Sequence, residues 1–187
     1  MPDATRLPLI GDDTDDPRLQ EIFERTVAVG HGHVPNLYRT LGNAPDMLRS
    51  WITFAWSLRN DPVTPRALRE LVIVRVATVL GSEYELTHHR PMAIEAGCSA
   101  EQIDHLGDWR SHTALYDADA LAALAVADRI AVGDPIEPAE WADLRDHFEA
   151  RACVEIALTA SFYVCVGRLI DAFDLPLDAP IDEPSDT

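Results

Sequence analysis

The sequence predicts an all-α protein, a helical bundle of about eight helices, from three observations. Apolar residues recur with helical spacing along most of the chain, helix-start and helix-stop residues separate these segments, and no segment shows the alternation of a strand. With 187 residues, 47% of them hydrophobic, the chain can bury a sizeable core. We expect one all-helical domain over residues 18–175, between an irregular N-terminal segment (1–17) and an acidic tail (176–187).

The expected helices span residues 18–29, 36–41, 45–59, 65–80, 82–96, a short stretch from 99, 117–132, 138–150 and 152–173. The helix over 65–80 is apolar almost all round, which is typical of a central helix packed on several sides. Thr64 is a candidate N-cap, with Pro65 at the first helical position. Gly81 is expected to end this helix, and Ser82 to cap the next one.

The charge of the chain limits its expected partners. Lys and Arg number 15 and Asp and Glu 32, which gives a formal net charge of −17. Such a surface repels phosphate backbones and anionic lipids, so we expect neither nucleic acid nor a membrane as a partner. No apolar leader opens the chain, and Cys98, Cys153 and Cys165 form no C-x-x-C pair. These cysteines predict buried thiols in a reducing cytoplasm.

The run from Ser82 to His89 is the strongest candidate for a functional site. On a helix, Glu85 and His89 are four positions apart and share a face, with Ser82 one turn earlier. A carboxylate beside an imidazole can fix its tautomer or raise its proton affinity, and such a pair can move a proton next to a carbonyl. The alternative is a solvent-exposed pair that adds a few tenths of a kcal/mol to the helix.

Two charged residues of the preceding apolar helix need an explanation. Glu70 is either an exposed first-turn acid or a member of the same cluster as His89. Arg75 lies among apolar residues, where its charge must find a partner. That partner is either a buried acid, such as Glu155 or Asp171, or the carboxylate of a substrate.

A metal site is the next alternative. The segment from Glu85 to His88 is an E-x-x-H, the spacing that di-iron bundles use, but such a bundle needs a second copy and the sequence has none. We therefore assign no metal ligands and no cofactor, and keep a metal-dependent enzyme that uses Glu85, His88 or His89 as an alternative. Trp56 either packs in the core or lines a pocket.

The chain resembles the carboxymuconolactone decarboxylase-like family, part of the alkylhydroperoxidase D-like superfamily. The resemblance is carried by residues 66–73, 83–89 and 96–97, and it extends to 34–38, 43–45, 162–163 and 168–172. It implies an alkylhydroperoxidase D-like helical fold that assembles into homo-oligomers (dimer, trimer or hexamer), with sites near subunit contacts.

In the peroxidase branch of that superfamily, a Glu on one helix is followed by C-x-x-C and then a His on the next. Glu70 and His89 match the Glu and the His, whereas Ser82 and Glu85 stand at the two cysteine positions. A thiol peroxidase needs a peroxidatic and a resolving sulfur. We therefore expect no thiol peroxidase activity.

These residues, together with the resemblance, predict cofactor-free acid/base chemistry, decarboxylation or isomerisation, on a small carbonyl or lactone acid. His89 would donate or accept the proton, Glu85 would orient it or act as the base, and Glu70 would support both. A non-catalytic or ligand-binding helical oligomer is the alternative from another class. Candidate substrate-binding residues are His88, Arg75, Tyr84, Ser82 and Trp56.

Overall fold

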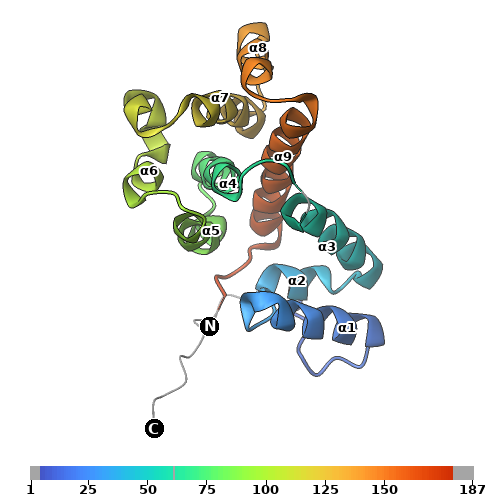
Figure 1. Ribbon diagram of the computed structural model, residues 1–187. Coiled ribbons are helices and arrows are strands. Elements are labelled where there is room, and N and C mark those ends of the chain that lie inside the picture. The colour runs from blue at the N-terminus through green and yellow to red at the C-terminus, as the bar shows by residue number, and fades with distance from the viewer. Residues whose placement is uncertain (1–4, 61, 179–187) are drawn as a thin grey trace. The chain divides into compact units, whose positions relative to one another are not determined.

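The computed structural model describes residues 5–60 and 62–178, and every regular element in these ranges is a helix (Figure 1). The predicted all-α class is therefore confirmed. A π-helical turn, η1 (Val27–His31), follows α1, and two 3-10 helices, η2 (Leu106–Ser111) and η3 (Thr113–Leu115), join α6 to α7. The α-helices of the described ranges are α1 (Pro17–Thr26), α2 (Asn36–Leu41), α3 (Pro45–Asn60), α4 (Arg66–Leu80), α5 (Glu83–Glu95), α6 (Ala100–Asp104), α7 (Ala118–Val132), α8 (Pro138–His147) and α9 (Ala150–Phe173).

The chain forms two compact units. The first comprises Met1–Phe54 and Ile170–Thr187, and the second comprises Ala55–Leu169. The boundaries fall inside α3 and inside α9. The single domain expected over residues 18–175 stays a prediction.

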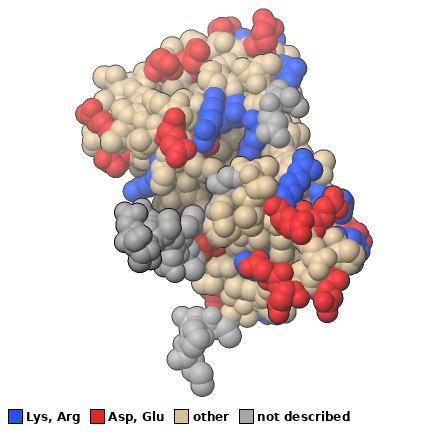
Figure 2. All heavy atoms as spheres, turned by 60° about the horizontal axis from the view of Figure 1, so that its bottom comes forward, with Lys and Arg blue, Asp and Glu red and all other residues tan. Residues whose placement is uncertain are grey.

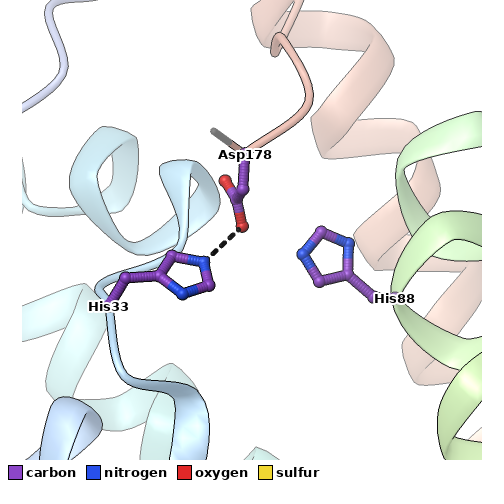
Figure 3. Close-up of side chains that lie close together, drawn as sticks. All are labelled: His33, His88 and Asp178. Atoms are coloured by element: carbon purple, nitrogen blue, oxygen red, sulfur yellow. Dashed lines mark hydrogen bonds and ion pairs between the residues drawn. The ribbon is translucent and has the colours of Figure 1, made fainter. Parts of the chain in front are cut away.

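In the first unit, the segment after α9 is fastened to the segment before α2. The carboxylate of Asp178 accepts a hydrogen bond from the backbone N–H of Asn36 at 2.7 Å, and its other oxygen lies 3.2 Å from Nε2 of His33 (Figure 3). Of the predicted acidic tail over 176–187, residues 179–187 lie outside the described residues. The core of this unit includes Leu19, Phe23, Leu37 and Leu48.

In the second unit, α4 is the central helix. It packs on α5 and on α7, and α8 packs on α7 (Figure 1). Helix α9 approaches α4 closely at Gly167. A Cβ atom added to this glycine would lie 2.8 Å from Cδ1 of Leu80 on α4. The predicted central position of this helix is confirmed by its buried residues, which include Leu68, Leu71, Val72, Ile73, Val74, Val76 and Ala77.

The connection from α4 to α5 is short. Gly81 adopts a left-handed conformation (φ 67°) and ends α4, as predicted. Ser82 occupies the N-cap position of α5, but its side chain makes no capping hydrogen bond. Two helices joined by so short a loop form a hairpin, which brings residues near the start of α4 beside residues later in α5. The predicted cap at the other end of α4 was wrong: Pro65 holds the N-cap position, because the backbone N–H and hydroxyl of Thr64 bind Glu155 on α9 instead.

Helix α9 is long and apolar enough to cross a membrane, judged by length and composition alone. Half of the most apolar 18-residue stretch of this helix is buried inside the structure. The core helices of many proteins that span no membrane have the same property, so the length and composition of α9 are weak evidence for a membrane span.

The surface drawn in Figure 2 exposes acidic side chains together with arginines.

Candidate acid/base site

A hydrogen bond between Glu70 and His89 joins α4 to α5. Oε2 of Glu70 lies 2.8 Å from Nδ1 of His89, and both side chains are buried. Because a carboxylate only accepts hydrogen bonds, Nδ1 carries the proton and Nε2 faces away from Glu70. The sequence alternative of an exposed first-turn acid at Glu70 therefore does not describe this residue.

Glu85 lies on the other side of the same imidazole. Its Oε2 is 3.5 Å from Nε2 of His89, and the Glu85 side chain is also buried. This separation is longer than a direct N–H···O hydrogen bond. Glu70 and Glu85 therefore flank opposite nitrogens of one buried imidazole.

Tyr163 of α9 lies against the imidazole. Its ring meets the His89 ring edge-on, with centroids 4.9 Å apart and an interplanar angle of 86°. Its hydroxyl accepts a hydrogen bond from Nη2 of Arg59 at 3.3 Å. Burial raises the pKa of Tyr163 to about 12, with a smaller contribution from the charge of Glu85. The phenol of Tyr163 therefore stays neutral near pH 7. Its ring packs edge-on against the His89 ring and thereby restricts the rotation of that ring.

Arg66 connects the buried cluster to solvent. Its Nε lies 3.8 Å from Oε1 of Glu70, its Nη2 lies 3.8 Å from Oε2 of Glu95, and its side chain is half exposed. At this distance the positive charge of Arg66 only partly offsets the negative charge of Glu70, and it can still attract an anion to the cluster.

The sequence prediction omitted Arg66 and Tyr163. Arg66 could have been found, because it precedes Glu70 by four residues on the same helix. Tyr163 lies in one of the segments that carry the resemblance, but the sequence could not indicate its contact with His89, because that contact joins α9 to α5 and depends on how these helices pack.

Ser82 belongs to the same side of α5 as Glu85. Both side chains are buried, and Oγ of Ser82 has no hydrogen-bond partner within the described residues. A buried hydroxyl without a partner is costly, which makes Ser82 a possible donor to a bound ligand. Its role as a substrate-binding residue stays a prediction.

His88 and Tyr84 pair with each other. Their rings stack with centroids 4.6 Å apart, and Nδ1 of His88 lies 2.7 Å from the backbone oxygen of Tyr84. His88 is half-buried and Tyr84 is buried. Trp56, another predicted substrate-binding residue, is half-buried on α3.

Arg75 has a structural partner, but not one of the two acids proposed from the sequence. Its Nε donates to Oδ1 of Asp128 on α7, and its Nη1 donates to the backbone oxygens of Leu106 and Gly107 at 2.7 and 3.0 Å. The choice of Glu155 or Asp171 was wrong, because α4 presents Arg75 to α7. The guanidinium lies in an internal ion pair, and no contact places it beside His89.

The prediction that all three thiols are buried is wrong for one of them. Cys98 and Cys153 are buried as expected, but Cys165 is exposed on α9. The thiol of Cys98 donates to the backbone oxygen of Ala67 at 3.4 Å. Burial, and then the negative charge of Glu70, raise the pKa of Cys98 to about 11. The thiol nearest the cluster is therefore held in its protonated, unreactive form.

Comparisons with known proteins agree with this fold. Residues 45–129 match the model of the Carboxymuconolactone decarboxylase family. A comparison with curated proteins finds no match.

Solved structures cover nearly the whole chain. An uncharacterized peroxidase-related protein from Silicibacter sp. TM1040 superposes with a TM-score of 0.79 at 22% identity, over 92% of this chain and 90% of that chain. The alkylhydroperoxidase AhpD core of a peroxidase-related protein from Ralstonia eutropha JMP134 gives 0.77 at 19% identity, over 93% and 92%. The debrominase Bmp8 without ligand gives 0.78 at 19% identity, over 96% and 94%.

At these identities the structural likeness shows the fold alone, while the matched segment contains Glu70, Ser82, Glu85 and His89. Residues 45–129 of this chain are therefore similar to the Carboxymuconolactone decarboxylase family, the fold is alkylhydroperoxidase D-like, and Ser82 and Glu85 stand where the resemblance noted from the sequence would place a C-x-x-C pair.

Proposed function

We propose that this protein is a cofactor-free acid/base enzyme, a carboxy-lyase or an isomerase, that acts on a small carbonyl or lactone acid. One observation carries the proposal: both nitrogens of a buried imidazole face carboxylates, Glu70 at Nδ1 and Glu85 at Nε2. The first carboxylate fixes the ring, and the second lies beside Nε2, so that together the imidazole and Glu85 can exchange a proton with a substrate. This is general acid/base equipment.

In a decarboxylation, the bond between the carboxylate carbon and the adjacent carbon breaks, and carbon dioxide leaves. The electron pair passes into the carbonyl group of the substrate, which forms an enolate. The proton held between His89 and Glu85 is then delivered to the enolate carbon. In an isomerisation, the same edge first removes a proton from carbon and returns it to another carbon.

An acidic substrate fits the surroundings of the cluster. Arg66 is the half-exposed cation nearest to Glu70 among the ion pairs of this site, and a guanidinium binds carboxylates well. Arg66 is therefore a better candidate than Arg75 for holding a substrate carboxylate, because Arg75 is engaged by Asp128.

The test uses His89→Gln and Glu85→Gln, assayed on muconolactone-type acids. Loss of a general acid/base group should reduce turnover by about 10²–10⁴-fold. His147→Gln is the matched control, since His147 is also paired with a carboxylate (Asp119, 2.9 Å) but lies outside the cluster. Unchanged turnover in both cluster variants would sink the assignment.

The alternatives make different predictions. The metal-dependent alternative uses Glu85, His88 or His89. An ion bound by both Glu85 and His89 would have to lie at the Nε2 edge, because Glu70 faces the opposite nitrogen. Turnover that survives removal of bound metal argues against this alternative. A non-catalytic oligomer would show no turnover of such acids by the folded wild-type protein.

We also propose that the protein forms homo-oligomers and is located in the cytoplasm. Val154 and Leu158 are one turn apart on α9 and are 55% and 40% exposed. Exposed apolar side chains grouped on one helix are typical of a subunit contact. Light scattering on the wild type and on Leu158→Glu tests this: the variant should have the smaller mass.

A further inference from the structure

A second cluster of titratable side chains lies outside the acid/base site, in the segment that follows α6. His105 follows α6, Asp108 lies within η2, and His112 follows η2. The potential ligand atoms of these three residues all lie within 4.8 Å of one another. Two imidazoles and a carboxylate are a ligand set that binds divalent transition metals.

The distances within this cluster suit an inserted ion better than direct hydrogen bonds. Oδ1 of Asp108 lies 3.6 Å from Nδ1 of His105 and 3.3 Å from Nδ1 of His112. Both distances exceed the usual N–H···O range. Zinc bonds of about 2.0–2.1 Å in tetrahedral geometry place neighbouring ligand atoms about 3.3–3.5 Å apart. Small side-chain adjustments would therefore complete three corners of a tetrahedron.

The two imidazoles are already aligned. Their rings stack with centroids 3.8 Å apart and an interplanar angle of 26°, so their Nδ1 atoms approach the same carboxylate oxygen from neighbouring positions. Asp108 is the member most exposed to solvent, with 61% of its side chain accessible, which leaves a path for an ion and room for water at the remaining position.

Hydrogen bonds from α4 and α7 hold the segment between the ligands in place. Arg75 binds the backbone oxygens of Leu106 and Gly107. Asp128 accepts from Nε1 of Trp109 at 3.2 Å and from Nη1 of Arg110 at 2.9 Å. These contacts order the segment before any ion arrives, which lowers the entropic cost of binding.

We propose that His105, Asp108 and His112 form a binding site for one divalent transition metal ion of the Zn²⁺ class. Each histidine binds through Nδ1, Asp108 binds through its carboxylate, and the fourth position is open to water or a small anion. The site is independent of the acid/base cluster, and its ion stabilises the segment that joins α6 to α7.

The experiment uses the full chain without a histidine tag. Zn²⁺ binding is measured by calorimetry, and Co²⁺ binding by visible absorption, for the wild type, for His105→Asn/His112→Asn and for Asp108→Asn. We expect one ion per wild-type chain and a loss of affinity of at least about tenfold in both variants. His147→Asn is the matched control, because it removes an imidazole beside Asp119, and it should bind as the wild type does.

Nitrogen-15 NMR of the histidine side chains identifies the ligand atoms in the wild type. Zn²⁺ should shift Nδ1 of His105 and of His112 while the signals of His89 stay in place. Circular dichroism shows whether each variant is folded, and the NMR measurement on the wild type decides the question if a variant is not. Zn²⁺ binding of equal strength in the folded double variant, or no stoichiometric binding by the wild type, would overturn the proposal.

Discussion

Oε2 of Glu70 lies 2.8 Å from Nδ1 of His89 and thereby connects the first half of α4 with the middle of α5. The connection is buried, so the hydrogen bond is made in a medium of low effective dielectric and holds the imidazole in one tautomer. The reactivity proposed for the Nε2 edge depends on this tautomer.

Glu70→Gln should disturb the tautomer and reduce activity. The amide is neutral, and its NH₂ group can donate to Nδ1, so the variant no longer requires a proton at Nδ1. We expect a mixture of His89 tautomers and a fall in turnover of about 10–100-fold, as for other groups that orient a reacting histidine. Nitrogen-15 NMR of His89 measures the tautomer, and the assay on muconolactone-type acids measures turnover.

Glu95→Gln is the control for that change, because Glu95 is the exposed carboxylate on the other side of Arg66. It should leave both the tautomer and the turnover unchanged. An unaltered Nδ1–H signal in folded Glu70→Gln would show that Glu70 does not set the tautomer.

Local sequence patterns predict most of the helices because their signals are short-range. Gly81 has the positive φ that favours glycine and ends α4, and Glu85 and His89 meet because they are one turn apart. The partner of Arg75 could not be predicted in this way. Asp128 is 53 residues away, and its selection depends on the packing of α4 against α7.

The wrong N-cap of α4 has a similar cause. Thr64 is a favourable cap by type and position, but the structure offers its N–H and hydroxyl a charged acceptor on α9, Glu155. A hydrogen bond to a charged group outweighs the ordinary contribution of a cap. Tyr163 was missed for the same reason, since only the packing of α9 brings it to His89.

Arg75→Met should destabilise the protein strongly. Arg75 and Asp128 are 14% and 15% exposed, so the substitution leaves a largely buried carboxylate without its closest cation. Removal of one partner of a buried pair costs about 3–5 kcal/mol, and the remaining Arg110 contact places the expected loss at the lower end of that range. The free energy of unfolding in urea measures this loss.

Arg145→Met is the control for this change, because Arg145 is exposed on α8. Its free energy of unfolding should stay within about 0.5 kcal/mol of the wild type. If Arg75→Met and the wild type unfold at the same urea concentration, Arg75 has no structural role. Substrate binding would then again be a candidate role for Arg75.

Glu155→Gln should reduce stability at neutral pH and weaken its dependence on acid. Burial alone would raise the pKa of Glu155, but hydrogen bonds from the backbone N–H groups of Val63 and Thr64 lower it overall. A lowered folded pKa stabilises the protein above the unfolded value, near 4.5, and this contribution is lost as the pH falls through the folded value.

We therefore expect Glu155→Gln to cost about 1.5–3 kcal/mol at pH 7, the range for hydrogen bonds to a charged group. The difference from the wild type should shrink as the pH falls below 4.5. Urea unfolding at a series of pH values measures both effects. Glu24→Gln, at an exposed position of α1, should be close to the wild type throughout, and a difference for Glu155→Gln that does not depend on pH would refute the assignment.

The thiols should differ in their reaction with iodoacetamide. A pKa of about 11 leaves a fraction on the order of 10⁻⁴ of Cys98 as thiolate at pH 7, and its side chain is buried. Cys165 is exposed and should be alkylated first, whereas Cys98 and Cys153 should react only after unfolding. Mass spectrometry of the labelled peptides measures the order, and Cys165→Ser should abolish labelling of the native protein. Rapid alkylation of native Cys98 would show a reactive thiol beside Glu70 and would revive a peroxidase role, whereas its protection leaves proton transfer as the chemistry available at His89.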